Sequence, residues 1–587
     1  MLIKTTIFSV IFLTYFHPSQ SANIVHYGKG ERVDVYVNKV GPYANPHETY
    51  HYYSLPICRP DRIIHKSLSL GQVLEGDRMA ESHYLFKFAD DQEMGSLCGE
   101  RTLSLLDTQR LVAAIEEEYF FEIIIDDLRI RNFLGFVEES KQVFPHVHRV
   151  FVYTEYPFIV EYNGDTIISI NLTMNAQSAK EVDFERELTI DFRYAIKWIS
   201  VDKPVDKRPS DGQLLFSARS MQVHWLSVIN ALLLVILLII GVTLILFSAV
   251  RRDLMNYNEI EDTDILMENG WKTVFLDVFR KPKYPMLLSA VLGVGTQFLT
   301  IGLAIQIVAT TNLINIHHHG NLNTLLIFLY ASTSFIAGYV SAAKYKQLDG
   351  KWWITNVNLT SGLFGVPMMV VWMLNNSVAW ANESTQALPW TTVVIVLIIA
   401  LAFGYPLAIA GALAGRHISS KFSPPCRTRT VPRQIPAAPV YLHGIVTAFF
   451  GGLLPFSSIF LELYYIFSTI WGRETYTLFH MLSISFGVVV AVVACLSIAL
   501  TYFQLNVEDY RWWWRSIFNG GSSALFIFAY GVYFLRHQSS MSGAVQLTEF
   551  FTHLSLLCYI AFLSLGTVSY FAAERFVFYI FSHVKTD

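Results

Sequence analysis

The chain has 587 residues, of which 53% are hydrophobic and only 15% are charged. This composition excludes a large soluble enzyme and an intrinsically disordered chain. The formal net charge of −4 is small for this length, so we expect no nucleic acid as a partner.

Residues 1-22 are predicted to be a signal peptide. A positively charged start that ends at Lys4 precedes the apolar run Thr5–Phe16, which is too short to span a bilayer comfortably, and small residues follow it. An uncleaved membrane anchor is the alternative interpretation. Cleavage would place the next segment in the lumen of the secretory pathway.

Residues 23-222 are predicted to form a luminal β-rich domain of the α+β class. Apolar and polar residues alternate from Val33 to Asn38, and the stretches 151–162 and 166–172 are rich in β-branched and aromatic residues. The stretch 102–118 has a more helical pattern. We therefore expect a domain made mainly of strands with one or two helices.

Two covalent features are expected in this domain. Cys58 and Cys98 are its only cysteines, so an oxidising lumen favours a disulfide between them, with two buried free thiols as the alternative. Asn171-Leu172-Thr173 is the acceptor sequence for N-glycosylation that we expect to be used.

The remainder of the chain contains nine stretches that are long and apolar enough to cross a bilayer. A helix needs about 20 mostly apolar residues to cross a core about 30 Å thick. We expect the first transmembrane helix at 223-250, a cytosolic loop at 251-284, an eight-helix bundle at 285-573 and a cytosolic tail at 574-587. The eight later spans are predicted near 285-312, 322-343, 354-374, 390-415, 439-467, 477-503, 516-535 and 551-573.

The distribution of Lys and Arg predicts the orientation of these spans, because cytosolic loops carry an excess of both. With the N-terminal domain in the lumen, the short luminal loops carry only Arg473 and Arg536. The loops assigned to the cytosol carry Arg251, Arg252, Lys272, Arg280, Lys281, Lys283, Lys344, Lys346, Lys351, Arg416, Lys421, Arg427, Arg429, Arg433, Arg511 and Arg515. We therefore expect a luminal β-rich N-terminal domain followed by an all-α bundle of nine transmembrane helices.

Several motifs resemble those of one membrane-protein family. They include Gly270-Trp271-Lys272, Gly451-Gly452-Leu453-Leu454-Pro455-Phe456, Glu508-Asp509-Tyr510-Arg511-Trp512-Trp513-Trp514-Arg515 and, in the luminal part, Tyr53-Ser54-Leu55-Pro56 and Gly71-Gln72-Val73-Leu74-Glu75-Gly76-Asp77-Arg78. Together they resemble the transmembrane 9 superfamily, or nonaspanins, over nearly the whole mature chain. Phe158 to Asn163 is most similar to the member-one subgroup.

The C-terminus is the part to which this resemblance gives a specific meaning. Lys585-Thr586-Asp587 is similar to the Lys-x-Asp/Glu terminus of the family, which implies capture by the COPI coat and retention in the Golgi. A lysine two residues before a doubly negative end is also a compact charge pattern that a receptor can read.

Three features of the bundle are candidates for function, each with a structural alternative. The residues Arg511, Trp512, Trp513, Trp514 and Arg515 are predicted to form an interfacial belt, with indole rings among lipid headgroups and arginines at lipid phosphates, or else a partner-docking surface. Glu462 is predicted near the luminal boundary of its span, in a structural role or in a cargo-related or proton-related one.

Gly411 and Gly415 have the spacing of a close helix–helix contact, either inside the bundle or with the transmembrane helix of another protein. Three consecutive histidines, His317 to His319, are not expected to bind a metal, because no second His or Cys cluster accompanies them. We therefore predict no metal site and no cofactor.

The family resemblance implies a Golgi or endosomal membrane protein that assists the sorting, trafficking or surface localisation of other transmembrane proteins, with a possible role in autophagy. Its partners would be membrane lipids, cargo proteins and the COPI coat. The alternative is a transporter or channel for a small solute or protons, suggested by nine helices, proline-broken spans and Glu462. An intramembrane enzyme is not expected, because the common catalytic motifs do not occur.

Overall fold

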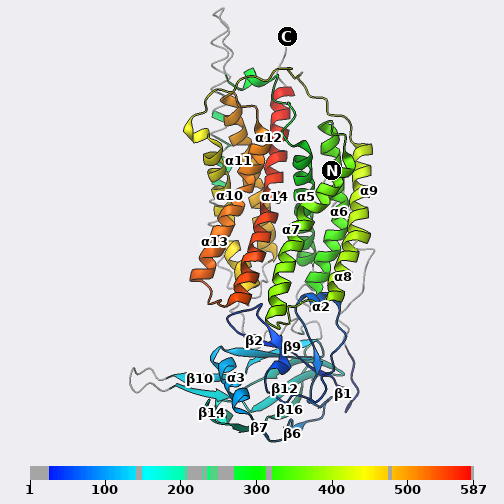
Figure 1. Ribbon diagram of the computed structural model, residues 1–587, viewed down its shortest axis with the longest axis vertical. Coiled ribbons are helices and arrows are strands. Elements are labelled where there is room, and N and C mark those ends of the chain that lie inside the picture. Colours follow the sequence, from blue (N-terminus) through cyan, green and yellow to red (C-terminus); the bar gives the residue numbers. More distant parts are fainter. Residues whose placement is uncertain are drawn as a thin grey trace, which may run out of the picture.

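A β-rich domain lies against one end of a helical bundle in the computed structural model of the chain (Figure 1). The structure describes residues 25–139, 148–204, 270–311, 320–426, 428–472 and 479–582, together with Arg208 and scattered positions between 229 and 251. The end of the bundle beside the β-rich domain is called the proximal end below, and the opposite end is called the distal end. The predicted signal peptide lies outside the described residues.

The β-rich domain is built from several small sheets rather than one large one. One sheet has the order β3-β2-β8-β9 with β4 also paired to β2, and another has the order β13-β12-β16-β6 with a parallel β12–β16 pair. The strands are β1 (Arg32–Val33), β2 (Val35–Pro42), β3 (Tyr50–His51), β4 (Ala80–Glu81), β5 (Phe86–Lys87), β6 (Gln92–Ser96), β7 (Arg101–Leu103), β8 (Tyr119–Ile125), β9 (Leu128–Phe133), β10 (Gly135–Glu139), β11 (His148–Val152), β12 (Glu155–Asn163), β13 (Thr166–Leu172), β14 (Lys180–Val182), β15 (Leu188–Ile190) and β16 (Arg193–Ser200).

Alternation of side chains along the strands forms the core of this domain. On β12, Tyr156, Phe158 and Val160 are buried while their neighbours are partly exposed, as a strand with one face on a core requires. Two helices complete the domain, α2 (Leu70–Leu74) and α3 (Leu105–Glu116), and each begins at a serine whose side chain accepts a backbone N–H of the first turn. The expected α+β class is confirmed.

The second part of the molecule is a bundle of long apolar helices. In the described ranges, eight helices are long and apolar enough to cross a membrane. The segments are α5 (Pro285–Thr311), α6 (Asn321–Gln347), α7 (Trp353–Ala381), α8 (Trp390–Ile399) continued by the π-helix η5 (Ala400–Gly404) and α9 (Tyr405–Ile418), α10 (Gly444–Trp471), α11 (Phe479–Asn506), α12 (Trp512–Gly521) continued by α13 (Ser523–His537), and α14 (Ala544–Ser582).

These helices correspond one by one to the eight later spans predicted from sequence. The first predicted span, 223-250, lies largely outside the described residues. The last helix differs most from its prediction, since α14 continues to Ser582 instead of ending near residue 573. The additional turns remain helical because Val577 and Phe581 are buried against the distal part of the protein, where the predicted cytosolic tail was expected to begin.

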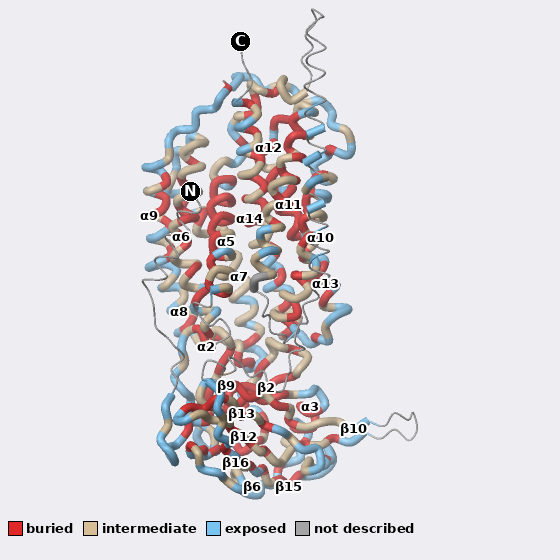
Figure 2. Tube along the Cα trace, turned by 180° about the vertical axis from the view of Figure 1, so that it is seen from behind, coloured by how far each residue is buried: buried red, intermediate tan, exposed pale blue. Residues whose placement is uncertain are grey.

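Packing within the bundle centres on α14, which contacts α5, α7, α11, α12 and α13. Burial is greatest along these central contacts and lower on the outer helices (Figure 2). Most of α5 and of the α12–α13 span is buried, whereas most of α7 and of the α8–α9 span lies at the outer surface.

The β-rich domain is held at the proximal end by hydrogen bonds to three helix connections. The Gly320 N–H donates to Glu75 Oε2 at 2.6 Å before α6, and Thr385 N–H donates to the Thr49 carbonyl at 2.8 Å between α7 and α8. Asn45 Nδ2 donates to the Ser542 carbonyl at 2.8 Å between α13 and α14. The domain therefore touches parts of the bundle that are widely separated in sequence.

Candidate functional site

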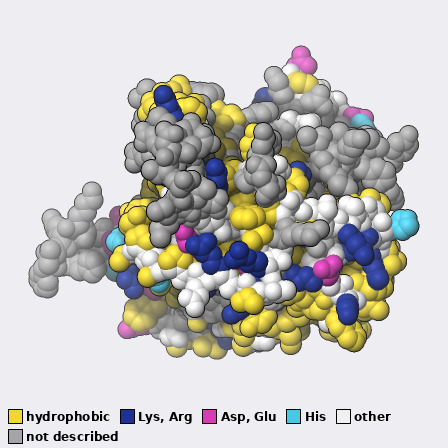
Figure 3. Space-filling model, turned by 90° about the horizontal axis from the view of Figure 1, so that it is seen from above, with side chains coloured by type: hydrophobic (Ala, Val, Ile, Leu, Met, Phe, Trp, Pro, Cys, Tyr) yellow, Lys and Arg dark blue, Asp and Glu magenta, His cyan; other side chains and the backbone are white. Residues whose placement is uncertain are grey.

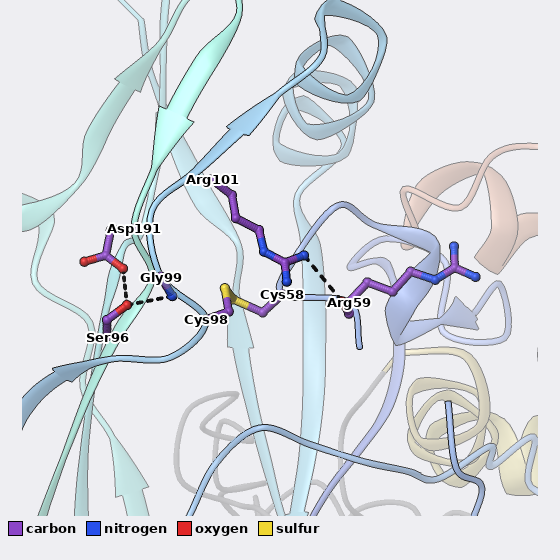
Figure 4. Close-up of a disulfide and its surroundings, with 7 residues drawn as sticks. All are labelled: Cys58, Arg59, Ser96, Cys98, Gly99, Arg101 and Asp191. Atoms are coloured by element: carbon purple, nitrogen blue, oxygen red, sulfur yellow. Dashed lines mark hydrogen bonds between the residues drawn. A yellow bond between two sulfur atoms is a disulfide. The ribbon is translucent and has the colours of Figure 1, made fainter. Parts of the chain in front are cut away.

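A disulfide joins Cys58 and Cys98 in the β-rich domain, with a Cα–Cα distance of 5.7 Å (Figure 4). It connects the loop after β3 to the segment between β6 and β7, and Arg101 beside it donates to the Arg59 carbonyl. The bond closes a loop between positions 40 residues apart, which restricts the unfolded chain and is worth about 2–4 kcal/mol. The structure therefore places the two cysteines as the sequence predicts.

The predicted glycosylation site lies on β13, an edge strand of its sheet. Asn171 is half-buried opposite Ile159 of β12, and Thr173 after the strand is exposed. The Asn171 Oδ1 atom is buried and makes no hydrogen bond to the described residues, so only the Thr173 end of the acceptor sequence is open to solvent. Glycosylation there stays a prediction.

A buried charge network lies beside the junction with the bundle. Glu122 of β8 is completely buried and accepts hydrogen bonds from Asn38 Nδ2 and Arg131 Nε, both at 2.6 Å. Burial alone would raise the pKa of this carboxyl, but Arg131, Lys39 and Arg129 hold the pKa well below its usual value. Glu122 is therefore a carboxylate that requires its cationic partners.

The Gly411 and Gly415 face is already occupied by another helix of the same chain. A Cβ atom at Gly411 would collide with the Phe335 carbonyl of α6, and one at Gly415 with the Tyr339 carbonyl. In return, Gly338 of α6 meets the backbone of α9 at Ala408. The close contact expected from the glycine spacing is internal, so these residues are not a free groove for another protein.

Helix α7 carries two glycines that, unlike Gly411 and Gly415, do not face another helix. A Cβ atom at Gly365 would meet nothing within 4 Å, and one at Gly362 would meet only Val366 of its own helix. Val366, Val370, Met373 and Leu374 are more than half exposed on the same helix. This free surface was not singled out from the sequence, because only the structure shows which glycines already have a neighbour.

The predicted interfacial belt differs from the structure at its central residues. Trp512 and Trp513 are buried, with 3% and 7% of their surface exposed, and Trp512 Nε1 donates to the Val278 carbonyl at 3.0 Å. Trp514 Nε1 donates to the Lys283 carbonyl at 2.7 Å. The indole N–H groups of Trp512 and Trp514 therefore bind the segment before α5, Trp512 and Trp513 are buried in the protein, and Trp514 stays half-exposed.

The two arginines of this motif also have protein partners. Asp509 accepts from Arg511 Nε at 3.1 Å and pairs with Arg515 Nη1 at 3.2 Å, and Arg515 also donates to the Leu442 carbonyl. The neighbouring Glu508 binds Arg433 at 2.7 Å. Arg515 is largely buried by these partners, whereas the Arg511 side chain remains mostly exposed, so contact of Arg511 with lipid phosphates stays a prediction.

Glu462 lies on α10 with 8% of its surface exposed. Its Oε2 atom is buried and makes no hydrogen bond to the described residues. The Gly-Gly-Leu-Leu-Pro-Phe motif lies one to three turns earlier, where Gly451 and Gly452 allow α10 to approach the backbone of α12 at Asn519 and Ser522. The motif is thus a helix contact, and the buried Glu462 lies further along the same helix.

A second intramembrane carboxyl group has a cationic partner that the sequence did not reveal. Glu574 of α14 forms an ion pair with Lys344 of α6, with N–O distances of 2.7 and 2.5 Å. The ion pair forms because α14 continues past this point beside α6.

The distal end carries most of the charge that the bundle exposes. Lys and Arg side chains gather across this face in Figure 3, which views the molecule from the distal end. The described basic residues there are Lys272, Arg280, Lys281, Lys283, Lys344, Lys346, Lys351, Arg416, Lys421, Arg429, Arg433, Arg511 and Arg515. Between the spans at the proximal end, the only Lys or Arg in the described ranges is Arg536.

Two other predicted features lie outside the described residues. They are the C-terminal Lys585 to Asp587 and the three histidines His317 to His319. Within the parts of the chain that the structure describes, no group of three or more His, Cys, Asp or Glu side chains is arranged to hold a metal ion.

The fold and these contacts define a polytopic membrane protein whose β-rich domain is docked on one end of its bundle. The family model described as "Endomembrane protein 70" matches residues 49–544. The chain is 46% identical to mouse "Transmembrane 9 superfamily member 1", covering 98% of this chain and 97% of the relative. The chain belongs to the Endomembrane protein 70 family, the transmembrane 9 superfamily, as its motifs indicate.

More distant relatives are similar over nearly their whole lengths. "Transmembrane 9 superfamily member 2" of Arabidopsis thaliana is 38% identical, covering 96% of this chain and 95% of the relative. A protein of Dictyostelium discoideum named "Putative phagocytic receptor 1b" is 39% identical, covering 97% and 96%. No solved structure matches the chain.

Proposed function

We propose that the protein binds the transmembrane helices of other membrane proteins and assists their sorting, trafficking or surface localisation in Golgi and endosomal membranes, and that it contributes to autophagy. The observation that carries this proposal is the free face of α7. Gly362 and Gly365 leave open space at the outer surface of a span whose neighbouring residues are large and apolar.

A glycine without a neighbour lets the backbone of a second helix approach closely, which is the main source of helix association in lipid. The face of α7 therefore offers partly exposed backbone at Gly362 and Gly365 between large apolar side chains, which is the geometry that close helix packing in lipid requires.

The proposed orientation places the β-rich domain in the lumen and the C-terminus in the cytosol. The concentration of Lys and Arg at the distal end supports it, because such residues are retained on the cytosolic side.

Retention through Lys585 and Asp587 by the COPI coat follows from this orientation and from the family resemblance. A Lys585→Ala variant is expected to leave the Golgi, as judged by fluorescence microscopy, and an unchanged location would contradict the retention mechanism.

The binding surface is tested by crosslinking and mass spectrometry on Golgi membranes. Gly365→Leu should remove specific transmembrane partners, because the added side chain fills the space that a partner helix needs. Gly487→Leu is the matched control, since Gly487 of α11 also has open space around its Cβ position but lies on a different helix. An unchanged partner list for Gly365→Leu would exclude α7 as the binding face.

Glu462 supports a second candidate, a transporter or channel for protons or a small solute. A buried carboxyl group with an oxygen that no described residue binds is typical of ion and proton pathways in membranes. Purified protein in liposomes would then conduct a flux that Glu462→Gln abolishes. Equal flux through liposomes with and without the protein would exclude this function.

A further inference from the structure

We propose that His47, Glu549 and His553 form a pH-dependent clamp between the β-rich domain and α14, which tightens when the two imidazoles are protonated and loosens when they are neutral. His47 lies in the loop between β2 and β3, and the other two residues lie one turn apart at the proximal end of α14. The clamp goes beyond the proposed function, because it concerns how the two parts of the molecule are held together.

The geometry places one carboxyl group between two imidazoles. His47 Nδ1 lies 3.2 Å from Glu549 Oε2, and His553 Nδ1 lies 2.8 Å from Glu549 Oε1. The Glu549 side chain is 17% exposed, so water screens these pairs much less than it screens ion pairs at an open surface. Of these two pairs, His47–Glu549 crosses the junction as an ion-pair contact without hydrogen-bond geometry, whereas His553 and Glu549 belong to the same helix.

Each pair is a salt bridge when its imidazole is protonated and a weaker neutral contact when the imidazole is neutral, and histidine is the side chain that ordinarily changes charge between about pH 5 and 8. The His47–Glu549 pair crosses the junction, so the clamp stabilises docking while its imidazole is charged. This contribution falls as the pH rises and the imidazoles become neutral. The His47 N–H donates to Gln546 Oε1 of α14 at 3.0 Å. Hydrogen exchange of this amide therefore measures how tightly the loop is docked on α14.

The remaining groups around the clamp do not reverse this sign. From the same loop, Glu48 accepts hydrogen bonds from Asn45 and Tyr50, so its negative charge adds to that of Glu549. From α7, Asn375 lies 3.4 Å from His553 and has no titrating group. From α10, the large buried side chain nearby is Trp471, which packs on Phe550 of α14.

On the α6 and α7–α8 side of the junction, the contacts include the Thr49–Thr385 contact, the Ser384 hydrogen bond to Thr49 and the hydrogen bond from the Gly320 N–H to Glu75. His51 lies on that side, where burial, Arg78 and His65 lower its pKa, so it stays neutral until the solution is more acidic. The pH response is therefore confined to the α13–α14 side of the junction.

Hydrogen–deuterium exchange on the full-length protein in lipid nanodiscs tests the clamp at pH 5.5 and 7.5, after correction for intrinsic exchange rates. Protection of the amides of 45–48 should be about tenfold lower at pH 7.5, which corresponds to one pKa unit of coupling. Residues 69–77, which belong to the non-titrating side, should show equal protection at both values. Equal protection of 45–48 at both values would refute the clamp.

Two variants separate the clamp from a general effect of pH. His47→Gln should bring the protection ratio of 45–48 close to one while protection along 560–580 of α14 is unchanged, and Glu549→Gln should do the same. His26→Gln is the matched control, because it removes an exposed His–Asp pair at 2.9 Å elsewhere in the β-rich domain. A wild-type ratio in His47→Gln would overturn the proposal.

Discussion

Single residues of the β-rich domain explain why its interior tolerates charge. Glu122 has no exposed surface, and its oxygens are bound by Asn38 and Arg131. Removing one partner of a buried ion pair leaves an uncompensated charge and costs about 3–5 kcal/mol. The network is therefore sensitive to any change that alters the charge of one member.

Glu122→Gln is expected to lower the free energy of unfolding by about 3–5 kcal/mol at pH 7, because Arg131 then lacks its carboxylate. In the unmodified protein the pKa of Glu122 is depressed. The ion pairs of Glu122 therefore contribute their full stability above the ordinary carboxyl pKa, and this stability is lost as the pH falls through the depressed pKa. Thermal unfolding in detergent, followed by tryptophan fluorescence, would measure it. Glu93→Gln on exposed β6 is the control, and equal stability of the two variants would contradict the expectation.

Residue-level predictions succeed where one rule of chemistry acts alone. The predicted luminal segment has only two cysteines, so each has one possible partner there and the Cys58–Cys98 pairing follows from counting. The partners of Arg511 and Arg515 could not be predicted in the same way. The Trp-rich run satisfies the pattern of a membrane interface equally well, and only the folded chain shows that Asp509 and the segment before α5 cover it.

At the scale of elements, the start of α12 behaves as a docking platform for the segment Trp271–Lys283. The ring of Trp512 packs on Tyr570 of α14 while its N–H binds Val278. The adjacent hydrogen bond from Trp514 fixes the chain just before α5 begins. The platform thereby links three segments that are distant in sequence.

Trp512→Ala is expected to destabilise the protein by about 3–5 kcal/mol, because it leaves a cavity and removes the hydrogen bond to Val278. Trp514→Ala should cost less, since Trp514 is only half-buried. Size-exclusion chromatography after heating, with recovery of monodisperse protein as the readout, compares the two. An equal loss in both variants would favour the interfacial belt over the docking platform.

The α6–α9 pair is the closest helix contact that the glycines of this chain permit. Gly338, Gly411 and Gly415 each face the backbone of the other helix. Gly411→Leu should therefore prevent α9 from packing and yield aggregated protein on fluorescence-detected chromatography. Gly365→Leu should give a monodisperse peak at the wild-type position, because its surroundings are open. A folded Gly411→Leu protein would show that α9 can move away from α6 at little cost.

The existence and approximate positions of the eight later spans were predictable because they follow from length and hydropathy, which depend on local sequence alone, whereas the ends of α7 and α14 depend on packing. Contacts between spans were not predictable, since the same Gly-x-x-x-Gly spacing serves an internal neighbour or an external one. The π-helix Ala400–Gly404 also had no clear signal, although Pro406 follows it directly and removes a backbone donor.

At the scale of the whole molecule, the orientation of the bundle in the membrane decides which compartment the β-rich domain and the basic distal face meet. The domain, the clamp and the acceptor sequence at Asn171 share one side of the bundle, and the Lys- and Arg-rich connections share the other. If the charge distribution sets the orientation, the whole β-rich domain meets the glycosylation machinery of the lumen.

The protein expressed in cultured cells is expected to lose mass on digestion with peptide N-glycosidase, and Asn171→Gln should remove that shift on gels. Since Asn171 is half-buried, a second acceptor keeps the orientation testable. Gln177→Thr creates an acceptor sequence at Asn175 in an exposed turn of the same domain and should add one glycan. Absence of a glycan on both Asn171 and Asn175 would place the β-rich domain on the cytosolic side of the membrane. The C-terminal Lys585 and Asp587 would then lie in the lumen, where the COPI coat could not bind them.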